Sequence, residues 1–234
     1  NLKKLIDKTA FAMAQQDVRY YLNGMLFEVT AGRLRTVATD GHRLAMCDAD
    51  TQTDSGERMQ VIVPRKGVQE LARLLNDDDG IVTITLGNKH IRATVGTVTF
   101  TSKLIDGKFP DYERVLPKGG DKIVLANREE LRHSLTRAAI LSNEKFRGIR
   151  LQLTPDMLRI QANNPDQEEA EDDLTVEYNG ASLEIGFNVQ YLMDVLGVLD
   201  NSTAKLTLGD SNSSALVQDA EGGSSVYVVM PMRL

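Results

Sequence analysis

The sequence has one cysteine, Cys47, no tryptophan and three histidines among 234 residues. One thiol cannot close an intramolecular disulfide, and one thiol with three scattered histidines cannot build a cysteine-based zinc site. We therefore expect no metal and no cofactor. The near-absence of cysteine is typical of the reducing cytoplasm, so we expect a cytoplasmic protein.

Long apolar runs are also missing. Stretches such as residues 61–63 and 226–232 are far shorter than the roughly 20 residues that a membrane helix needs. We therefore expect no membrane association. The chain begins at Asn1, inside an apolar helical pattern formed by Leu2, Leu5, Ile6 and Met13, which predicts a piece of a longer protein.

An excess of positive charge is absent as well. Residues 1–113 carry 15 Lys and Arg against 15 Asp and Glu, and residues 114–234 carry 12 against 18, which gives the net charge of -6. Proteins that hold nucleic acid by neutralising many phosphates are usually basic. The balance argues against tight, static nucleic-acid binding, although local contact stays possible.

What the chain does contain is an internal repeat with a spacing of roughly 120 residues. GMLFEVT at residues 24–30 matches GIRLQLT at residues 148–154, and ITLGN at residues 84–88 matches LTLGD at residues 206–210. Between them, the helical pattern from Val68 matches the one from Val189. The order of elements is therefore the same twice.

Each copy is predicted to contain a helix, a strand pair, a second helix and further antiparallel strands, which makes the fold class α+β. Asn127 followed by Glu130 is a start signal for the first helix of the second copy. The Pro- and Gly-rich stretch 106–120 suits a linker. We place two domains at residues 1–113 and 114–234.

The sequence contains few residue patterns that are typical of an enzyme. Asp40, two residues before His42, could orient that histidine for hydrolysis, but an Asp-Gly turn is the more economical interpretation. No glycine loop with Gly-Lys-Ser or Gly-Lys-Thr is present, and no nucleophile elbow. The terminal residues 228–234 are apolar, which predicts either a core strand or the wall of a groove for a partner.

Six segments together resemble one known family. They are QDVRYYLNG (16–24), TVATDGHRLA (36–45), VIVPRKG (61–67), FPDY (109–112), ILSNEKFRG (140–148) and the terminal MPMRL. These segments are similar to the bacterial replicative sliding clamp, the beta subunit of DNA polymerase III. Members have three similar domains per chain, and the two repeats here resemble the middle and C-terminal domains.

The resemblance implies a non-enzymatic processivity factor of DNA replication. In this family two chains close into a ring around duplex DNA, with weak DNA contacts, and tether the polymerase alpha subunit, the clamp loader and other proteins that carry a clamp-binding motif. A ring cannot leave DNA sideways, so it does not need to neutralise many phosphates. Simple DNA binding and hydrolysis at His42 remain the alternative functions.

The resemblance also implies site residues. The DNA-contacting set would be Gln16, Asp17, Arg19, Tyr20, Tyr21, Arg65 and Lys66. The partner-peptide pocket would be Leu22, Thr39, Gly41, His42, Arg43, Leu44, Pro110, Arg114, Val115, Ser214, Val228, Val229, Met230, Pro231, Met232, Arg233 and Leu234. Asn212 stands where we expect an apolar wall residue.

The ring joint would be formed on this chain by Ile140, Leu141, Glu168, Glu169 and Glu171. Its other side would belong to a first domain that this sequence does not contain. The resemblance therefore implies a homodimeric ring for the full-length protein, whereas we expect this chain to be mainly monomeric.

Overall fold

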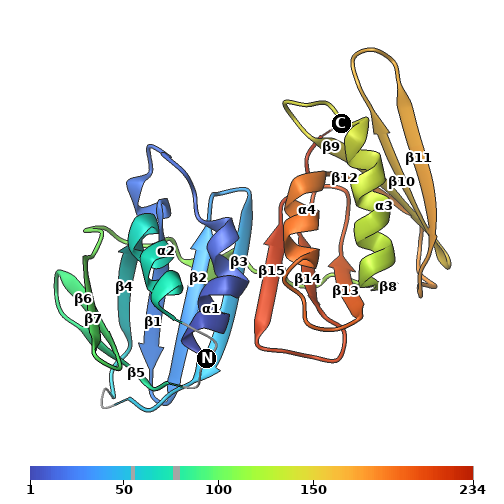
Figure 1. Ribbon diagram of the computed structural model, residues 1–234. Helices are drawn as coiled ribbons and strands as arrows, with labels where there is room; N and C mark the ends of the chain where they lie inside the picture. The colour runs from blue at the N-terminus through green and yellow to red at the C-terminus, as the bar shows by residue number, and fades with distance from the viewer. Residues whose placement is uncertain (54–55, 76–79, 234) are drawn as a thin grey trace. The chain divides into compact units, whose positions relative to one another are not determined.

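The computed structural model describes residues 1–53, 56–75 and 80–233 (Figure 1). Its contacts divide the chain into two compact units, Asn1–Tyr112 (unit 1) and Glu113–Leu234 (unit 2). In the described residues, each unit combines two α-helices with two antiparallel sheets, which confirms the α+β class and the tandem repeat.

Unit 1 has a four-stranded sheet in the order β4-β1-β2-β3 and a three-stranded sheet in the order β5-β6-β7. The helices α1 and α2 cover one face of the first sheet (Figure 1). Met25, Phe27 and Val37 are fully buried in its core. The elements are α1 (Leu2–Thr9), β1 (Gly24–Thr30), β2 (Arg33–Thr39), β3 (Arg43–Asp50), β4 (Met59–Pro64), α2 (Arg65–Leu74), β5 (Val82–Leu86), β6 (His90–Val95) and β7 (Val98–Lys103), with short 3-10 turns at Ala10–Ala12, Tyr20–Leu22 and Tyr112–Arg114.

Unit 2 repeats this plan. Its sheets have the orders β11-β10-β9-β12 and β15-β14-β13-β8, and α3 packs against α4 and against β10 and β11. Leu135, Phe187 and Val217 are buried. The elements are β8 (Lys122–Asn127), α3 (Arg128–Ile140), β9 (Gly148–Thr154), β10 (Met157–Asn163), β11 (Glu169–Thr175), β12 (Leu183–Asn188), α4 (Val189–Leu196), β13 (Thr203–Leu208), β14 (Ala215–Asp219) and β15 (Ser225–Val229).

Helix starts in unit 2 follow local capping rules. The Glu130 amide donates to the Asn127 side-chain oxygen (3.0 Å), as the sequence predicted for α3. Asn188 caps α4 in the same way, since it accepts from the Gln190 amide (2.9 Å). Each cap satisfies an amide that has no partner inside the helix.

The first helix is shorter than its apolar pattern suggested. α1 ends at Thr9, and the chain continues through a 3-10 turn to Met13, which is extended. The Thr9 hydroxyl donates to the Leu5 carbonyl (2.7 Å) and reaches the Thr36 hydroxyl on β2 (3.1 Å). Tertiary packing of Thr9 and Met13 therefore ends the helix before the periodicity does.

Candidate functional site

The turn between β2 and β3 carries the largest group of expected pocket residues in unit 1. The Asp40 carboxylate accepts hydrogen bonds from the backbone amides of His42 (2.9 Å) and Arg43 (3.1 Å), and from Arg43 Nε (3.2 Å). Gly41 has a φ of 88°, a left-handed conformation that favours glycine. Asp40 therefore holds an Asp-Gly turn together, which supports the turn interpretation over a catalytic Asp–His pair.

This turn has a buried side and an exposed side. Leu44 and Thr39 are buried at 2% and 8% exposure, whereas Gly41 and His42 are exposed. Leu22 is also buried, at the end of the Tyr20–Leu22 turn. Leu22, Thr39 and Leu44 are thus buried, whereas Gly41 and His42 at the tip of the turn are open to solvent.

The loop with the expected DNA-contacting residues lies against this turn. Arg19 donates through Nε and Nη2 to the Asp17 carboxylate (3.0 and 2.9 Å), and through Nη2 to the Asp40 carbonyl (3.3 Å). Hydrogen bonds from the Arg19 side chain and amide lower the pKa of Asp17 to about 2. Arg19 therefore links two sets of residues that the family resemblance assigned to different ligands: the DNA-contacting loop and the turn of the partner-peptide pocket.

The two tyrosines of the loop differ in exposure. Tyr20 is 56% exposed, Tyr21 is half-buried, and their rings meet edge to face at 5.7 Å. Gln16, at the start of the loop, is exposed and has a φ of 55°. An exposed ring beside a cation suits contact with nucleic acid.

Arg65 and Lys66 begin α2 and reach the same region. The Arg65 amide donates to the Asn23 carbonyl (2.9 Å), and its guanidinium donates to the Met13 carbonyl (3.3 Å). Lys66 is exposed. The structure thus brings together the expected DNA-contacting residues of unit 1.

In unit 2, the expected pocket residues 228–234 lie at the end of β15 and directly after it. Val228 and Val229 are buried, and Met230, directly after the strand, is 46% exposed. The Met232 amide then donates to the Gly186 carbonyl of β12 (2.9 Å). Pro231 is half-buried, Arg233 is exposed, and Leu234 lies outside the described residues.

Two further residues bear on this part of unit 2. Ser214 is half-buried just before β14, and Asn212 belongs to a turn in which its amide donates to the Asp210 carboxylate (2.9 Å). This bond uses the backbone amide of residue 212, and the Asn212 side chain is exposed, so a polar side chain is accommodated where an apolar one was expected.

The sequence interpretation missed the exposed aromatic Phe146. It is 58% exposed, and its amide donates to the Asn143 side chain (3.0 Å). The register of β9 with β12 pairs Gly148 with Asn188, two residues from the Gly186 that binds the tail. An aromatic residue inside the polar turn NEKFRG was the signal that could have identified it.

The residues expected at the ring joint lie on one edge of unit 2. Ile140, at the end of α3, is 76% exposed, and Leu141 is half-buried. Strand β11 pairs only with β10 in the described part of the chain, so its other edge is open. Glu168, Glu169 and Glu171 are exposed on or just before this strand.

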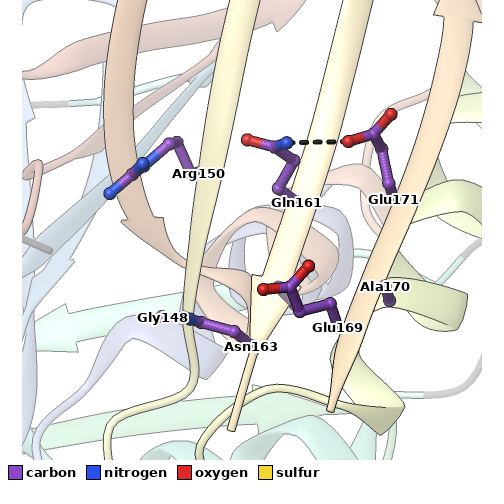
Figure 2. Close-up of a pocket in the computed structure, with 8 residues that line it drawn as sticks. Gly148, Arg150, Gln161, Asn163, Glu169, Ala170 and Glu171 are labelled. Atoms are coloured by element: carbon purple, nitrogen blue, oxygen red, sulfur yellow. Dashed lines mark hydrogen bonds between the residues drawn. The ribbon is translucent and has the colours of Figure 1, made fainter. Parts of the chain in front are cut away.

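Figure 2 shows the sheet face beside that edge. Arg150, Gln161, Glu169 and Glu171 line a cavity of about 200 Å³, and Gln161 donates to Glu171 (2.8 Å). Further along, Arg159 binds the Asp173 carboxylate (2.7 Å). Gln161 and Arg159 on β10 thus bind the carboxylates directly opposite them on β11, which stabilises the strand pair.

Among the described residues, no group of three or more His, Cys, Asp or Glu side chains is arranged to hold a metal ion. In the same part of the chain, no helix is long and apolar enough to span a membrane.

Two family models match this chain. The model for the central domain of the DNA polymerase III beta subunit matches residues 1–111, and the model for the C-terminal domain of the same protein matches residues 113–233. Among curated proteins, the beta sliding clamps of Pseudomonas aeruginosa and Escherichia coli K12 are 68% and 56% identical over 233 residues. The alignments cover 100% of this chain and 64% and 63% of those proteins.

Solved structures of sliding clamps are similar to this chain along its whole length. The P. aeruginosa sliding clamp bound to griselimycin has a TM-score of 0.97 at 68% identity, and the Bartonella birtlesii clamp bound to the same compound has 0.95 at 42%. They cover 100% of this chain, which covers 63% and 64% of theirs. The chain therefore spans somewhat less than two thirds of the length of the relatives it matches.

Proposed function

Because the chain belongs to the DNA polymerase III beta subunit family, the sliding clamps, we propose that it acts as a non-catalytic processivity factor of DNA replication. The full-length protein closes as a two-chain ring around duplex DNA in the cytoplasm. It tethers the polymerase alpha subunit, the clamp loader and other proteins with a clamp-binding motif. The observation that carries this proposal is the match of both units to consecutive domains of one family.

We assign residues 1–113 to the clamp middle domain and residues 114–234 to the C-terminal domain. The charge of the chain agrees with encirclement. A net charge of -6 disfavours tight binding to linear DNA, whereas a ring that is held by topology benefits from few phosphate contacts because it can then slide. The local contacts come from the loop at Gln16–Tyr21 and from Arg65 and Lys66.

Partner peptides bind the residues that the sequence assigned to the pocket in both units. The exposed Gly41-His42 turn, together with the buried apolar residues Leu22 and Leu44, supports this in unit 1. The exposed Met230 supports it in unit 2, because a flexible thioether adapts to different apolar anchors. Apolar anchors of a short peptide bind well where the surrounding contacts exclude water.

The ring joint uses Ile140, Leu141 and the acidic edge of β11. The apolar Ile140 and the open strand edge supply packing and backbone hydrogen bonds, and the carboxylates select a basic partner. We expect the chain itself to be mainly monomeric, and a stable closed dimer in light scattering would contradict this.

Peptide binding tests the proposal. A peptide of the type Gln-Leu-Ala-Leu-Phe is expected to bind with a micromolar Kd, which corresponds to about -8 kcal/mol. Met230→Ala should weaken peptide binding about tenfold. Leu44→Ala should also weaken it, and because Leu44 is buried, the folding of this variant is checked before binding is measured. Ile123→Ala is the matched control, since Ile123 is 49% exposed in the same unit as Met230 and belongs to none of the proposed sites. Unaltered binding by Met230→Ala would reject the pocket.

A further inference from the structure

The segment from Phe109 to Val115 contributes three proposed pocket residues, Pro110, Arg114 and Val115. All three are exposed, and Val115 is 43% exposed. Between and before them lie two buried side chains, Phe109 at 6% and Tyr112 at 2% exposure. Phe109 and Tyr112 therefore anchor the segment by burial, and Tyr112 also carries a polar group.

The hydroxyl of Tyr112 forms hydrogen bonds with charged side chains of the sheet. It donates to Glu28 Oε1 (2.9 Å) and accepts from Arg35 Nη1 (3.0 Å). The Arg35 guanidinium also lies 5.8 Å from the centre of the Tyr112 ring. Hydrogen bonds to charged groups are stronger and more directional than those between neutral groups, so they fix both the position and the rotation of the ring.

These partners belong to one row across the four-stranded sheet. The register pairs Glu28 with Gln60 on β4 and with Arg35 on β2, and it pairs Arg35 with Asp48 on β3. Gln60 donates to Glu28 Oε2 (2.6 Å), and Arg35 holds Asp48 through two bonds (2.5 and 2.8 Å). A row of directly opposed side chains has little freedom, because every neighbour constrains the next.

The row lies on the sheet face opposite α1. Thr36, next to Arg35 on β2, faces α1 because its hydroxyl donates to the Leu5 carbonyl (3.1 Å). Neighbouring strand residues point to opposite faces, so Arg35 points away from α1. Tyr112 is therefore held on the sheet face opposite α1 by Glu28 and Arg35, which Gln60 and Asp48 hold in turn.

We propose that Tyr112 is a positioning residue for partner binding: its hydroxyl, fixed by Glu28 and Arg35, holds the segment that presents Pro110, Arg114 and Val115. This inference rests on the proposed function. A segment fixed before binding loses less conformational freedom when a peptide arrives, so the binding free energy is retained. A phenylalanine at this position would fill the same space but would lack both hydrogen bonds.

The test compares two variants of the same network. Tyr112→Phe removes the hydroxyl, whereas Gln60→Leu removes another ligand of Glu28, since Gln60 Nε2 donates to Glu28 Oε2 (2.6 Å). Tm and the Kd for the Gln-Leu-Ala-Leu-Phe peptide are measured for both. We expect both variants to lower Tm, but only Tyr112→Phe to raise the Kd, by about threefold to tenfold. An unchanged Kd in Tyr112→Phe, or Kd changes that follow Tm in both variants, would overturn the proposal.

Amide hydrogen exchange separates this inference from the proposed function. In Tyr112→Phe the amides of residues 111–115 should exchange at least several times faster than in the wild type, while they should stay unchanged in Gln60→Leu. If the wild-type chain bound no peptide, the proposed function would be wrong, yet faster exchange would still support the positioning role. Unchanged exchange would overturn it. Glu28→Gln provides a second route, since it weakens the acceptor of the Tyr112 hydroxyl without altering the ring.

Discussion

The guanidinium of Arg19 lies directly on Gly41, so that a Cβ added to Gly41 would come within 2.9 Å of Arg19 Nη2. The left-handed φ of 88° favours glycine at position 41, and an added Cβ would also force the Arg19 guanidinium to shift. The contact joins the proposed DNA-contacting loop to the proposed pocket turn within unit 1.

Gly41→Ala should destabilise the protein by about 1–3 kcal/mol, because it adds backbone strain and displaces Arg19. Gly32→Ala is the matched control, since Gly32 has a φ of 73° but no atom within 4 Å of an added Cβ. Chemical denaturation of both variants should give the larger loss for Gly41→Ala. Equal losses would show that the Arg19 contact adds nothing to the strain.

The second prediction concerns pH. Burial acts to raise the pKa of Glu28, but hydrogen bonds from Gln60, Arg58 and Tyr112 outweigh it, so the pKa lies below its usual value of 4.5. A carboxyl with a lowered folded-state pKa stabilises the protein above its unfolded-state pKa and loses that contribution as the pH falls. The free energy of unfolding should therefore decrease below about pH 4.5.

Glu28→Gln should remove this part of the pH dependence, because an amide does not titrate in that range. Stability is measured by denaturation between pH 3 and pH 7 on the wild type, on Glu28→Gln and on the exposed-site control Glu144→Gln. The control should keep the wild-type slope. A Glu28→Gln profile as steep as that of the wild type would assign the acid sensitivity to other groups.

The third prediction tests the start of α3. Asn127→Ala should cost about 1 kcal/mol of stability, because the Glu130 amide loses its side-chain acceptor. His133→Ala, an exposed change on the same helix, should stay within about 0.5 kcal/mol of the wild type. Both are measured by thermal unfolding, and an effect of Asn127→Ala as small as that of the control would refute the capping role.

The fourth prediction separates a clamp from a simple DNA-binding module. Affinity for linear duplex DNA should be weak and should depend little on salt, since few phosphates are contacted. Lys66→Gln should reduce the slope of log K against log salt by about one, whereas Lys205→Gln should not change it. A steep slope, typical of many neutralised phosphates, would favour the binding-module alternative.

Much of the fold follows from local signals. The repeated strand pairs, the helices from Val68 and Val189, and the Asn127 cap all depend on residues within a few positions of one another. The end of α1 at Thr9 did not follow, because the packing of Thr9 against Thr36 overrides the apolar periodicity. Local rules describe an element well until a distant strand competes for its side chains.

The contacts around the site were the hardest to foresee. The hydrogen bond between Tyr112 and Glu28 joins residues 84 positions apart, and no local sequence pattern around either residue predicts it. The approach of Arg19 to Gly41 likewise depends on how two loops pack. The family resemblance identified many of these residues as site residues, but their contacts with one another follow from the three-dimensional structure.

The acidic edge of β11 also governs how the protein behaves when it is crowded. Two identical edges that approached each other would bring Glu169 and Glu171 of one copy against the same carboxylates of the next, and like charges repel. An open strand edge has unpaired backbone amides and carbonyls, which can pair with another chain and start fibril formation. Here its own charge prevents self-stacking, so concentrated solutions of this chain should resist aggregation until salt or acid neutralises that edge.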